Sequence, residues 1–340
     1  IWTNNTFDKA VIVKTPGGDV RYYDYLSGPI FKYIRGIYSA IRRYPVSLVA
    51  QAGDIINVAA GTYLEAGQIV INKNLSIVGE NKTTTIIKPL QSTGGSGDTQ
   101  AWWLIMDNIN FNLTNVTLDG SGYDVRTGVR FRGNGTVDNC LIKNITYPGY
   151  MGFGVALTFQ TTSIMNVTVS NCELSNIGRV GIHVDRNGPS SPSSVGTIIN
   201  NIYLGKGTGD HLDYAVEVGG GAHAIITNNT ISNCLGVALS DGSTSAGILA
   251  TTYYDNGTSA LVNNNQFNNN STAIAVGYNA SDLSQVEAHN NSFTNCEYGV
   301  TSTAPPVNAE NNWWGTALEL QIQAMISGPV DYDPWIGKAE

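Results

Sequence analysis

The sequence is poor in charged residues and has no long apolar run. Only 13% of its 340 residues are charged, about half of the roughly 25% that is usual in globular proteins. The 18 basic and 26 acidic side chains give a net charge of −8, whereas nucleic-acid binding requires clustered positive charge. No stretch approaches the roughly 18 consecutive apolar residues of a transmembrane helix. These absences exclude a nucleic-acid partner and a membrane-spanning helix.

The chain also starts without a Met and without a basic-then-apolar leader, since it begins IWTNN. We therefore expect that an export signal has been removed. The sequence contains 14 Asn-x-Ser/Thr sequons, of which roughly half would arise by chance in so Asn-, Ser- and Thr-rich a chain. The excess favours an extracellular or cell-surface protein, secreted and glycosylated.

Asparagine and glycine are abundant and recur in register. Both residues favour turns, because they accept a positive φ. One repeated segment has an Asn, two further residues and then an apolar side chain. Its copies are VDNCLIKNI (137–145), VSNCELSNI (169–177), ITNNTISNC (226–234), VNNNQFNNN (262–270), AHNNSFTNC (288–296) and AENNWWG (309–315).

A second segment recurs in step with the first and alternates apolar residues with a period of two, which predicts strands. Its copies are GVRFR (128–132), GVALTF (154–159), GIHVDR (181–186), AVEVG (215–219), GILATT (247–252), AIAVGY (273–278) and GVTST (299–303). A short repeat of this kind cannot bury its apolar face alone, so the copies must stack as coils. An antiparallel sandwich would lack this register. The pattern therefore predicts an all-β, single-stranded parallel β-helix of roughly 9–11 coils with capped ends.

The four cysteines follow the same register. Cys140, Cys172, Cys234 and Cys296 have no CxxC or Cys/His spacing for zinc, and they are too few for a disulfide scaffold. Cys140 and Cys172 hold equivalent places on neighbouring coils, which lie about 4.8 Å apart. A disulfide between them is geometrically possible, but buried free thiols are the favoured interpretation.

The two ends of the chain depart from the repeat. Residues 1–48 contain a predicted strand at 10–14 and an amphipathic helix at 31–44, which would cap the solenoid. The predicted β-helix spans 49–316, and the segment 317–340 forms a second cap. Closed ends disfavour end-to-end stacking of molecules. Two other forms of homo-oligomer remain as alternatives, namely lateral association and donation of residues 1–14 as a strand to a second copy.

Two segments resemble a known family. Residues 38–80 contain GDxIxVxxGxY followed by xxIxKxLxIxGE, which is similar to the entry coil of pectate-lyase-like right-handed β-helix proteins. ENNWWG (310–315) and SGPVDYDPWIG (327–337) resemble the closing coil of β-helix repeats of the carbohydrate-binding and sugar-hydrolysis type. The resemblance implies a right-handed solenoid. It implies no single activity, because the fold hosts lyases, hydrolases, esterases, epimerases and non-enzymatic surface proteins.

The motifs of the catalytic branches are missing. The sequence has no WIDH-like strand, no RxPxxR-like segment and no DPHD-like or pectin-esterase pattern. The nearest approach to a polygalacturonase motif is GDH at 209–211, which lacks its partner motifs. No catalytic residue can therefore be transferred from the family.

The repeat alignment nevertheless places polar side chains on one outward face. If the apolar residues of the second segment point inward, their neighbours gather on an exposed sheet within four coils. These neighbours are Arg130, Arg132, His183, Asp185 and Glu217. Guanidinium groups bind uronate carboxylates bidentately, and His183, Asp185 and Glu217 are candidate acid and base catalysts. The alternative is a solvated row of opposite charges that pair across strands.

Insertions extend the candidate site. NGPSSPSSVG (187–196) and GKGTGDHLD (205–213) follow the strand of His183, and long loops on a rigid scaffold often bind ligands. Tyrosines on a later coil could stack on sugar rings or pack beneath a loop. The further candidates for substrate binding are Arg186, Asp210, His211, Asp213, Tyr253 and Tyr254.

Three carboxylates are weak candidates for metal ligands. Asp119 and Asp124 flank a glycine turn. Asp107 comes earlier in the sequence, and the predicted register places it beside Arg132. Calcium prefers such oxygen ligands, although simple turn formation is the favoured role of LDGSGYD (118–124). Ca²⁺ is therefore the one cofactor that the sequence suggests.

Three functions fit these features. The favoured one is an exported or cell-surface protein that recognises a polysaccharide or cell-surface glycan, acidic in composition, on the exposed sheet. The first alternative is a polysaccharide lyase or glycoside hydrolase that uses the His183 cluster. The second alternative is a structural subunit of a surface layer, fibre or appendage.

Overall fold

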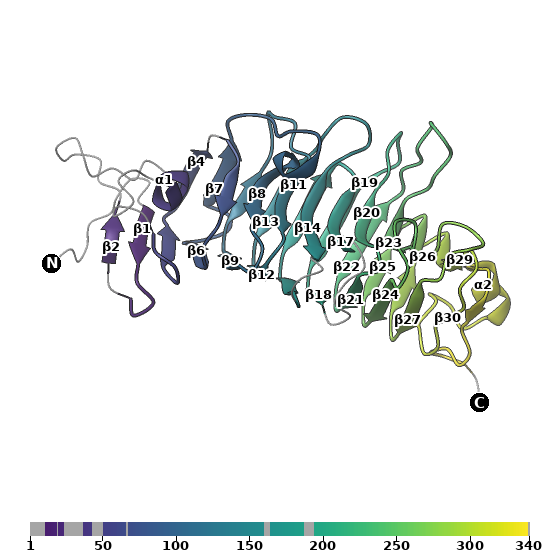
Figure 1. Cartoon of the computed structure of the whole chain (residues 1–340). Coiled ribbons are helices and arrows are strands. Elements are labelled where there is room, and N and C mark those ends of the chain that lie inside the picture. The colour runs from purple at the N-terminus through teal and green to yellow at the C-terminus, as the bar shows by residue number, and fades with distance from the viewer. Residues whose placement is uncertain are drawn as a thin grey trace.

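The computed structural model describes residues 11–18, 20–23, 37–42, 50–65, 67–159, 164–186 and 194–338. The chain winds into an elongated solenoid whose coils follow one another from the N-terminal to the C-terminal end (Figure 1). Each full coil contributes one strand to each of three sheets, named here A, B and C. The parallel β-helix expected from the sequence is confirmed.

Sheet A consists of thirteen described strands, and all pairings from β3 onward are parallel. In spatial order they are β2 (Val20–Tyr23), β1 (Val11–Lys14), β3 (Ile55–Val58), β6 (Leu75–Gly79), β9 (Asn110–Thr114), β12 (Asn134–Asp138), β15 (Asn166–Ser170), β18 (Val195–Ile199), β21 (His223–Thr227), β24 (Ser259–Asn263), β27 (Gln285–His289), β30 (Val307–Asn308) and β32 (Val330–Asp331).

Sheet B follows sheet A within every coil. Its strands are β4 (Gly61–Glu65), β7 (Thr85–Pro89), β10 (Thr117–Asp119), β13 (Leu141–Ile145), β16 (Glu173–Ile177), β19 (Ile202–Gly207), β22 (Thr230–Cys234), β25 (Gln266–Asn268) and β28 (Ser292–Thr294).

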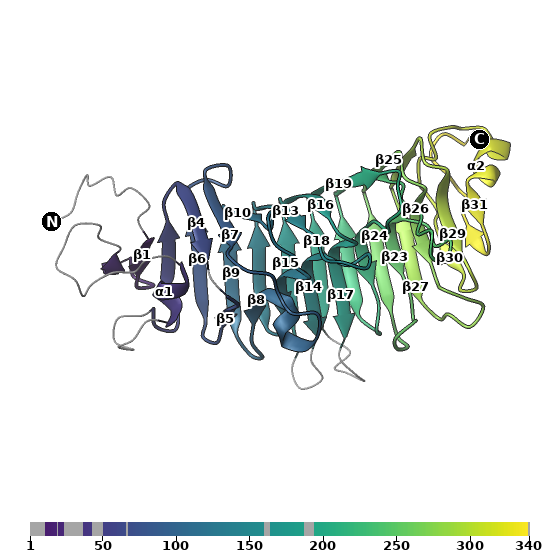
Figure 2. The same ribbon diagram turned by 90° about the horizontal axis from the view of Figure 1, so that it is seen from above.

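Sheet C closes each coil and carries the candidate site. Its strands are β5 (Ile69–Ile71), β8 (Ala101–Ile105), β11 (Thr127–Phe131), β14 (Phe153–Phe159), β17 (Val180–Arg186), β20 (Tyr214–Val218), β23 (Ala246–Ala250), β26 (Thr272–Val276), β29 (Tyr298–Ser302) and β31 (Ile326–Ser327). A view from above shows the strands of neighbouring coils lying side by side along the rod (Figure 2).

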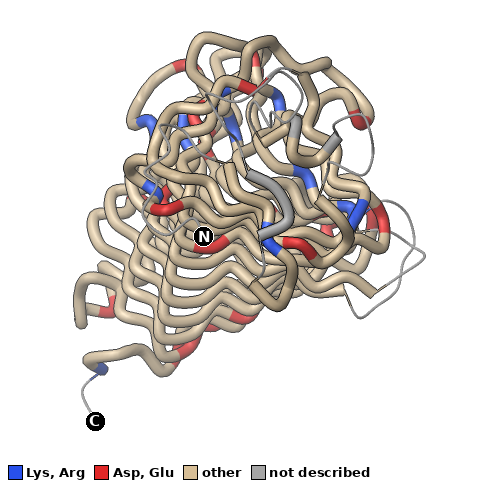
Figure 3. Tube along the Cα trace, turned by 90° about the vertical axis from the view of Figure 1, so that its left-hand side faces the viewer, with Lys and Arg blue, Asp and Glu red and all other residues tan. Residues whose placement is uncertain are grey.

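The core runs along the axis as columns of apolar side chains. Val129, Val155, Ile182 and Val216 occupy one register of sheet C, and all are buried. Burial of such columns is the main stabilising term, at about 25 cal/mol per Å² of apolar surface. Charged residues are sparse along the walls when the molecule is seen along its axis (Figure 3).

The turn from sheet A to sheet B is the same in most coils and is made by asparagine. Eight asparagines at this corner have φ between +47° and +60°, a conformation that Asn accepts more readily than most residues. They are Asn115, Asn139, Asn171, Asn200, Asn228, Asn264, Asn290 and Asn311. The next residue begins a second column that points into the core.

That second column forms a buried amide ladder. Its asparagines are Asn201, Asn229, Asn265, Asn291 and Asn312. The backbone N–H of Asn201 donates to Oδ1 of Asn229 at 2.8 Å, and the N–H of Asn229 donates to Oδ1 of Asn265 at 2.9 Å. The ladder satisfies the buried polar groups of the corner, which would otherwise be costly.

The cysteines continue these columns as free thiols. Cys140 and Cys172 occupy the ladder column on the two preceding coils, where the N–H of Cys172 donates to Oδ1 of Asn201 at 2.9 Å. Cys234 and Cys296 lie two coils apart with Asn270 between them. All four thiols are buried and unpaired, so the disulfide considered for the first pair is not formed. Burial raises the pKa of the Cys140 thiol well above its usual value.

Both ends carry short helices. At one end α1 (Ile37–Arg42) packs beside β1, which pairs antiparallel with β3. The buried carboxylate of Glu65 accepts the N–H of Ile37 at 2.6 Å, which satisfies an otherwise unpaired donor of the helix. At the other end α2 (Glu319–Ala324) covers the last coil. The described helix α1 lies within the helix expected at 31–44, and residues 1–10, 31–36 and 43–49 lie outside the described residues.

Candidate functional site

Polar side chains line the outer face of sheet C in the register expected from the sequence. Arg130, Ala156, His183 and Glu217 pair from strand to strand across β11, β14, β17 and β20. Alternation within each strand puts these side chains outside because their neighbours fill the core. On the next strand, β23, Leu249 occupies the same position, so the polar row ends at β20.

This face contains an open cavity of about 190 Å³, called here the sheet C cavity. Strands β11, β14 and β17 form its floor, while residues from the preceding and following loops form its walls. The lining residues are Gln100, Arg126, Thr127, Arg130, Phe153, Ala156, Thr158, His183, Asp185 and Tyr254. The cavity therefore brings together four residues that the sequence predicted for the site, namely Arg130, His183, Asp185 and Tyr254.

Among the described residues of the cavity, three polar side chains have buried atoms without hydrogen-bond partners, namely Arg126, His183 and Asp185. Nε2 of His183 and Oδ1 of Asp185 are both shielded from solvent and unbonded. The His183 ring packs on Phe153 with 5.1 Å between ring centroids. Its Nε2 also lies 3.8 Å from Oε1 of Glu217. An unsatisfied buried polar atom costs about 1–3 kcal/mol, so such atoms call for a specific explanation.

The arginines of the site differ in their partners. Arg132 forms a two-bonded ion pair with Asp107 at 2.9 and 3.0 Å and a further bond to Asp98 at 2.7 Å. Arg130 is also held, by Thr158 and by the carbonyl oxygen of Gly97. Both guanidinium groups are therefore committed to partners within the chain.

Arg126 is a cation of a different kind. Its guanidinium lies over the ring of Tyr147 at 5.8 Å, and its buried Nε has no hydrogen-bond partner. Within the part of the chain that the structure describes, Arg126 forms no ion pair with a carboxylate. Arg186, by contrast, lies 3.9 Å from Asp255. The cavity thus contains one arginine whose charge is available to a ligand.

A loop of the chain covers the N-terminal part of this sheet face. The segment 91–100 contains the 3₁₀ helix η2 (Gly97–Gln100) and leads into β8. Leu104, the outward residue of β8 in register with Arg130, is only 2% exposed. Every residue of β8 is buried, so this strand is covered on both faces.

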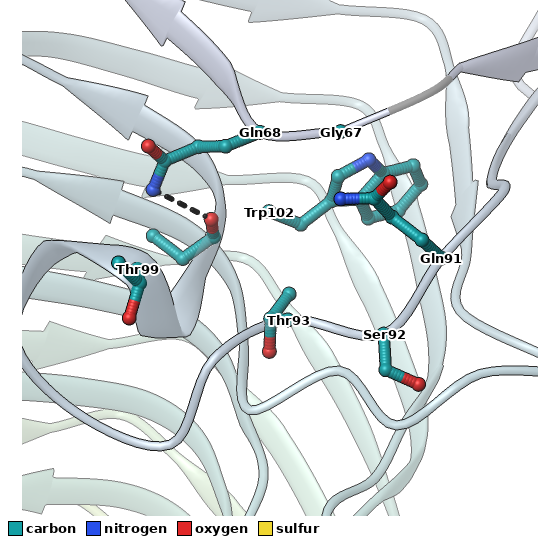
Figure 4. A pocket seen from close by; sticks show the side chains of 8 residues that line it. Gly67, Gln68, Gln91, Ser92, Thr93, Thr99 and Trp102 are labelled. Carbon is teal, nitrogen blue, oxygen red and sulfur yellow. Dashed lines mark hydrogen bonds between the residues drawn. The ribbon is translucent and has the colours of Figure 1, made fainter.

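A second pocket of about 200 Å³ lies on the other side of this loop. Gln68, Gln91 and Trp102 project toward it, and Gln68 Nε2 donates to the carbonyl oxygen of Ala101 at 3.0 Å (Figure 4). The lining contains no charged side chain. Its residues are Gly67, Gln68, Gln91, Ser92, Thr93, Thr99, Ala101 and Trp102.

Three exposed tyrosines form a group at the C-terminal edge of the cavity, and one of them, Tyr254, lines it. The ring of Tyr253 meets those of Tyr254 and Tyr278 edge-on, with centroid distances of 4.9 and 5.2 Å. Their exposed fractions are 61%, 68% and 43%, so the rings are not packing beneath a loop. Partial desolvation and then the charge of Glu217 raise the pKa of Tyr254.

The insertion 205–213 is held by its own polar residues. Asp210 accepts a hydrogen bond from Tyr150 and another from the N–H of Leu239 at 2.9 Å. The ring of His211 bonds the carbonyl oxygen of Gly207 at 3.1 Å. Neither residue lines the sheet C cavity. Residues 187–193 of the other insertion lie outside the described residues.

Asp213, in the same insertion, is buried and holds neighbouring residues of the insertion in place. The side chain is fully buried, and its carboxylate accepts the hydroxyl of Tyr203 and the backbone N–H of Lys206. Burial raises the pKa of Asp213, although the ammonium of Lys206 opposes this shift. The expectation that Asp213 contacts substrate is therefore corrected, because the residue is fully buried and both of its carboxylate oxygens accept hydrogen bonds within the chain.

The three candidate calcium ligands are separated. Asp107 pairs with Arg132. Asp119 accepts Nδ2 of Asn144 at 2.7 Å and lies 3.4 Å from Lys88. The backbone N–H of Asp124 donates to Ser92. The described residues contain no group of three or more His, Cys, Asp or Glu side chains placed to hold a metal ion.

Sequence reasoning missed several residues of the site. Arg126 precedes β11 by one position and lies outside the alternating pattern, so alignment of strands could not find it. Asp98 and Gln100 belong to a loop that has no counterpart in the repeat. The one available signal was the length of the segment between β7 and β8, which equals that between β22 and β23 and exceeds the corresponding segments of the other coils.

The comparisons with known proteins agree with this architecture. A family model described as "Right handed beta helix region" matches residues 127–313, which is more than half of the chain. The chain therefore belongs to the family of right-handed β-helix proteins. No curated protein matches it.

Solved structures resemble the chain at low identity. The periplasmic alginate epimerase AlgG has 10% identity and a TM-score of 0.44, with 83% of each chain covered. Pectin methylesterase PemA from Erwinia chrysanthemi has 13% identity and a TM-score of 0.43, with 74% of this chain and 79% of that one covered. The A-module of mannuronan C-5 epimerase AlgE4 from Azotobacter vinelandii has 14% identity and a TM-score of 0.38, over 77% of this chain and 70% of that one. Among the described residues, no helix has the length and apolar character needed to cross a membrane.

Proposed function

We propose that this protein binds an acidic polysaccharide on the outer face of sheet C, outside the cell or at its surface. The observation that carries the proposal is the sheet C cavity, where buried His183 Nε2 and Asp185 Oδ1 have no partners beside the unpaired guanidinium of Arg126. Folding leaves such groups unsatisfied at a cost, and a bound ligand would supply the missing hydrogen bonds.

The chemistry of the lining favours a sugar acid. A uronate carboxylate would pair with Arg126 through a charge-assisted bond, which is stronger than a bond between neutral groups. Sugar hydroxyls both donate and accept, so they match the acceptor Oδ1 of Asp185 and the ring nitrogen of His183. The tyrosine hydroxyl of Tyr254 adds a further donor at the rim.

Binding to immobilised pectate, alginate and hyaluronan, compared with a neutral dextran, tests the proposal. We expect retention on at least one uronate polymer, with loss of about tenfold or more in affinity for Arg126→Gln, because a hydrogen bond to a charged group contributes about 1.5–3 kcal/mol. The matched control is Lys82→Gln, which removes a cation that pairs with Glu173 on sheet B, away from the cavity. Equal affinity for dextran, or equal losses in both variants, would contradict the proposal.

A second candidate function is catalysis at the same place. The imidazole of His183 next to the carboxylate of Glu217 is an arrangement that general bases use. In a β-elimination the base would take the proton next to the uronate carboxylate, the bond to the leaving oxygen would break, and a carbon–carbon double bond would form. The departing oxygen would take a proton from solvent. An ultraviolet assay for the unsaturated product, alongside a reducing-end assay for hydrolysis, separates this candidate from binding alone.

A further inference from the structure

The outer face of sheet C is fully covered on the N-terminal side of the cavity and only partly covered on its C-terminal side. On the N-terminal side, the segment 91–100 covers β8, and the outward Leu104 is 2% exposed. On the C-terminal side, the equivalent positions hold Leu249, Ala275 and Thr301, which are all half-buried. The face is therefore asymmetric along the axis of the solenoid.

The covering segment is anchored where the cavity begins. Asp98 binds Arg132 at 2.7 Å and lies 3.6 Å from Arg130. The carbonyl oxygen of Gly97 accepts Nη1 of Arg130 at 2.9 Å. Arg130 stands on β11, the first strand of the cavity floor, and Arg132 follows directly after the end of that strand. The loop therefore forms a wall across the path that a polymer would follow along the sheet.

The anchored loop also separates two pockets of different chemistry. Gln100, at the end of η2, lines the sheet C cavity, whereas Thr99 lines the second pocket. The cavity holds Arg126, His183 and Asp185, but the second pocket is lined by neutral residues. Neighbouring volumes that do not share a lining residue are not one continuous groove.

From this arrangement we propose that the sheet C cavity receives the end of a polysaccharide chain, not an internal segment. The terminal sugar lies against the wall formed by η2, and the next sugars run toward β23 and β26. Tyr253, Tyr254 and Tyr278 lie on this side and offer exposed aromatic surface for sugar rings. This inference rests on the proposed function, because it specifies which part of the polymer the same site binds.

Stoichiometry tests the inference directly. Isothermal titration with pectate and alginate, each size-fractionated into a short and a long pool, gives the number of proteins per chain. We expect one protein per chain in both pools, whatever the length. A number that grows with chain length would overturn the inference while leaving polysaccharide binding intact. No binding to any uronate polymer would instead overturn the proposed function, and this inference with it.

Two variants test the wall itself. Asp98→Ala removes the carboxylate that anchors the loop, and we expect longer chains to bind more than one copy of this variant. Gln91→Ala alters the second pocket behind the wall, and we expect its affinity to equal that of the wild type. Circular dichroism checks that the Asp98→Ala variant is folded. If only one copy of the folded variant still binds to each long polysaccharide chain, the loop is not what stops the polymer. An affinity loss of tenfold in Gln91→Ala would show that the polymer passes into the second pocket. Either result overturns the inference.

Discussion

Nε2 of His183 lies 3.8 Å from Oε1 of Glu217, across two adjacent parallel strands and in direct register. Glu217 is 6% exposed and does not line the cavity itself. In the proposed site, this carboxylate would therefore act on a ligand only through the charge that it places beside the imidazole. His183 is the residue that would contact the ligand, and Glu217 is a positioning residue.

The first prediction concerns this pair. We expect His183→Gln to weaken binding of a uronate polymer by about tenfold, which corresponds to the loss of about 1.4 kcal/mol from one ligand contact. If the site is catalytic, the same substitution should lower turnover by about 10²-fold or more, the usual contribution of a general base. Titration calorimetry and the ultraviolet assay measure the two effects. Unchanged affinity and unchanged turnover in a folded variant would remove His183 from the site.

The second prediction concerns the buried carboxylate of Asp213. Asp213→Asn weakens the bonds from Tyr203 and Lys206 and leaves the half-buried ammonium of Lys206 without a countercharge. Loss of one partner of a buried pair typically costs about 3–5 kcal/mol. Urea unfolding followed by circular dichroism measures the change in the free energy of unfolding.

The control for Asp213 is Asp241→Asn in the neighbouring loop. Asp241 is exposed and accepts the N–H of Ser243 at 2.9 Å, so its loss should cost less than about 1 kcal/mol. Similar losses in the two variants would mean that the Asp213 interactions do not hold the insertion in place.

The third prediction concerns the amide ladder. Asn229→Ala removes Oδ1, the acceptor for the N–H of Asn201, and Nδ2, which donates to the carbonyl oxygen of Ile198. Each buried group left unpaired costs about 1–3 kcal/mol, so we expect a total loss of about 3 kcal/mol. The exposed Gln285 on β27 provides the comparison as Gln285→Ala. Thermal unfolding midpoints that agree for the two variants would contradict a stabilising role for the ladder.

The fourth prediction concerns acid stability and Asp282, which is 1% exposed. Burial alone would raise the pKa of this carboxyl, but hydrogen bonds from Ser284 and Thr252 outweigh burial and hold the pKa below its ordinary value. A group with a lowered pKa in the folded state contributes stability above the unfolded-state value of about 3.9, and this contribution is lost as the pH falls through the folded-state pKa. Asp282→Asn should therefore be less stable than the wild type at neutral pH.

The difference for Asp282→Asn should shrink as the pH falls below about 4, because the wild-type carboxyl is then protonated as well. Urea unfolding at a series of pH values measures this convergence. Asp255→Asn, at a half-buried position where the side chain is 38% exposed, serves as the control. A difference that stays constant through the acid range would show that the hydrogen bonds to Asp282 do not depend on its charge.

The repeat in the sequence was sufficient to predict which residues share a register. Arg130, His183 and Glu217 were assigned to one outward column from the alternation alone, and the strand pairings confirm it. Such a prediction succeeds because every coil repeats the same backbone path, so one aligned position fixes the others.

The parts of the site that lie in loops could not be predicted. Asp98 meets Arg132 because a non-repeating segment folds back over β8, and no periodicity encodes that path. Asp213 was expected in the site because it sits in an insertion, yet its burial follows from Lys206 and Tyr203 within the same loop. Loop conformation depends on such individual contacts, which a sequence pattern does not contain.

The exclusively nearest-neighbour pairing of the coils has a consequence for how the molecule acquires its structure. Each internal strand of sheet C pairs with the strand one coil earlier and the strand one coil later. Among the described strands, the pairing in this sheet therefore joins neighbouring coils and not distant parts of the chain. Folding can therefore nucleate in any run of coils and propagate outward in both directions. A partly formed rod exposes an unpaired strand edge at each growing end, and such edges promote aggregation. The short helices α1 and α2 lie at the two ends of the rod, so their docking would end propagation.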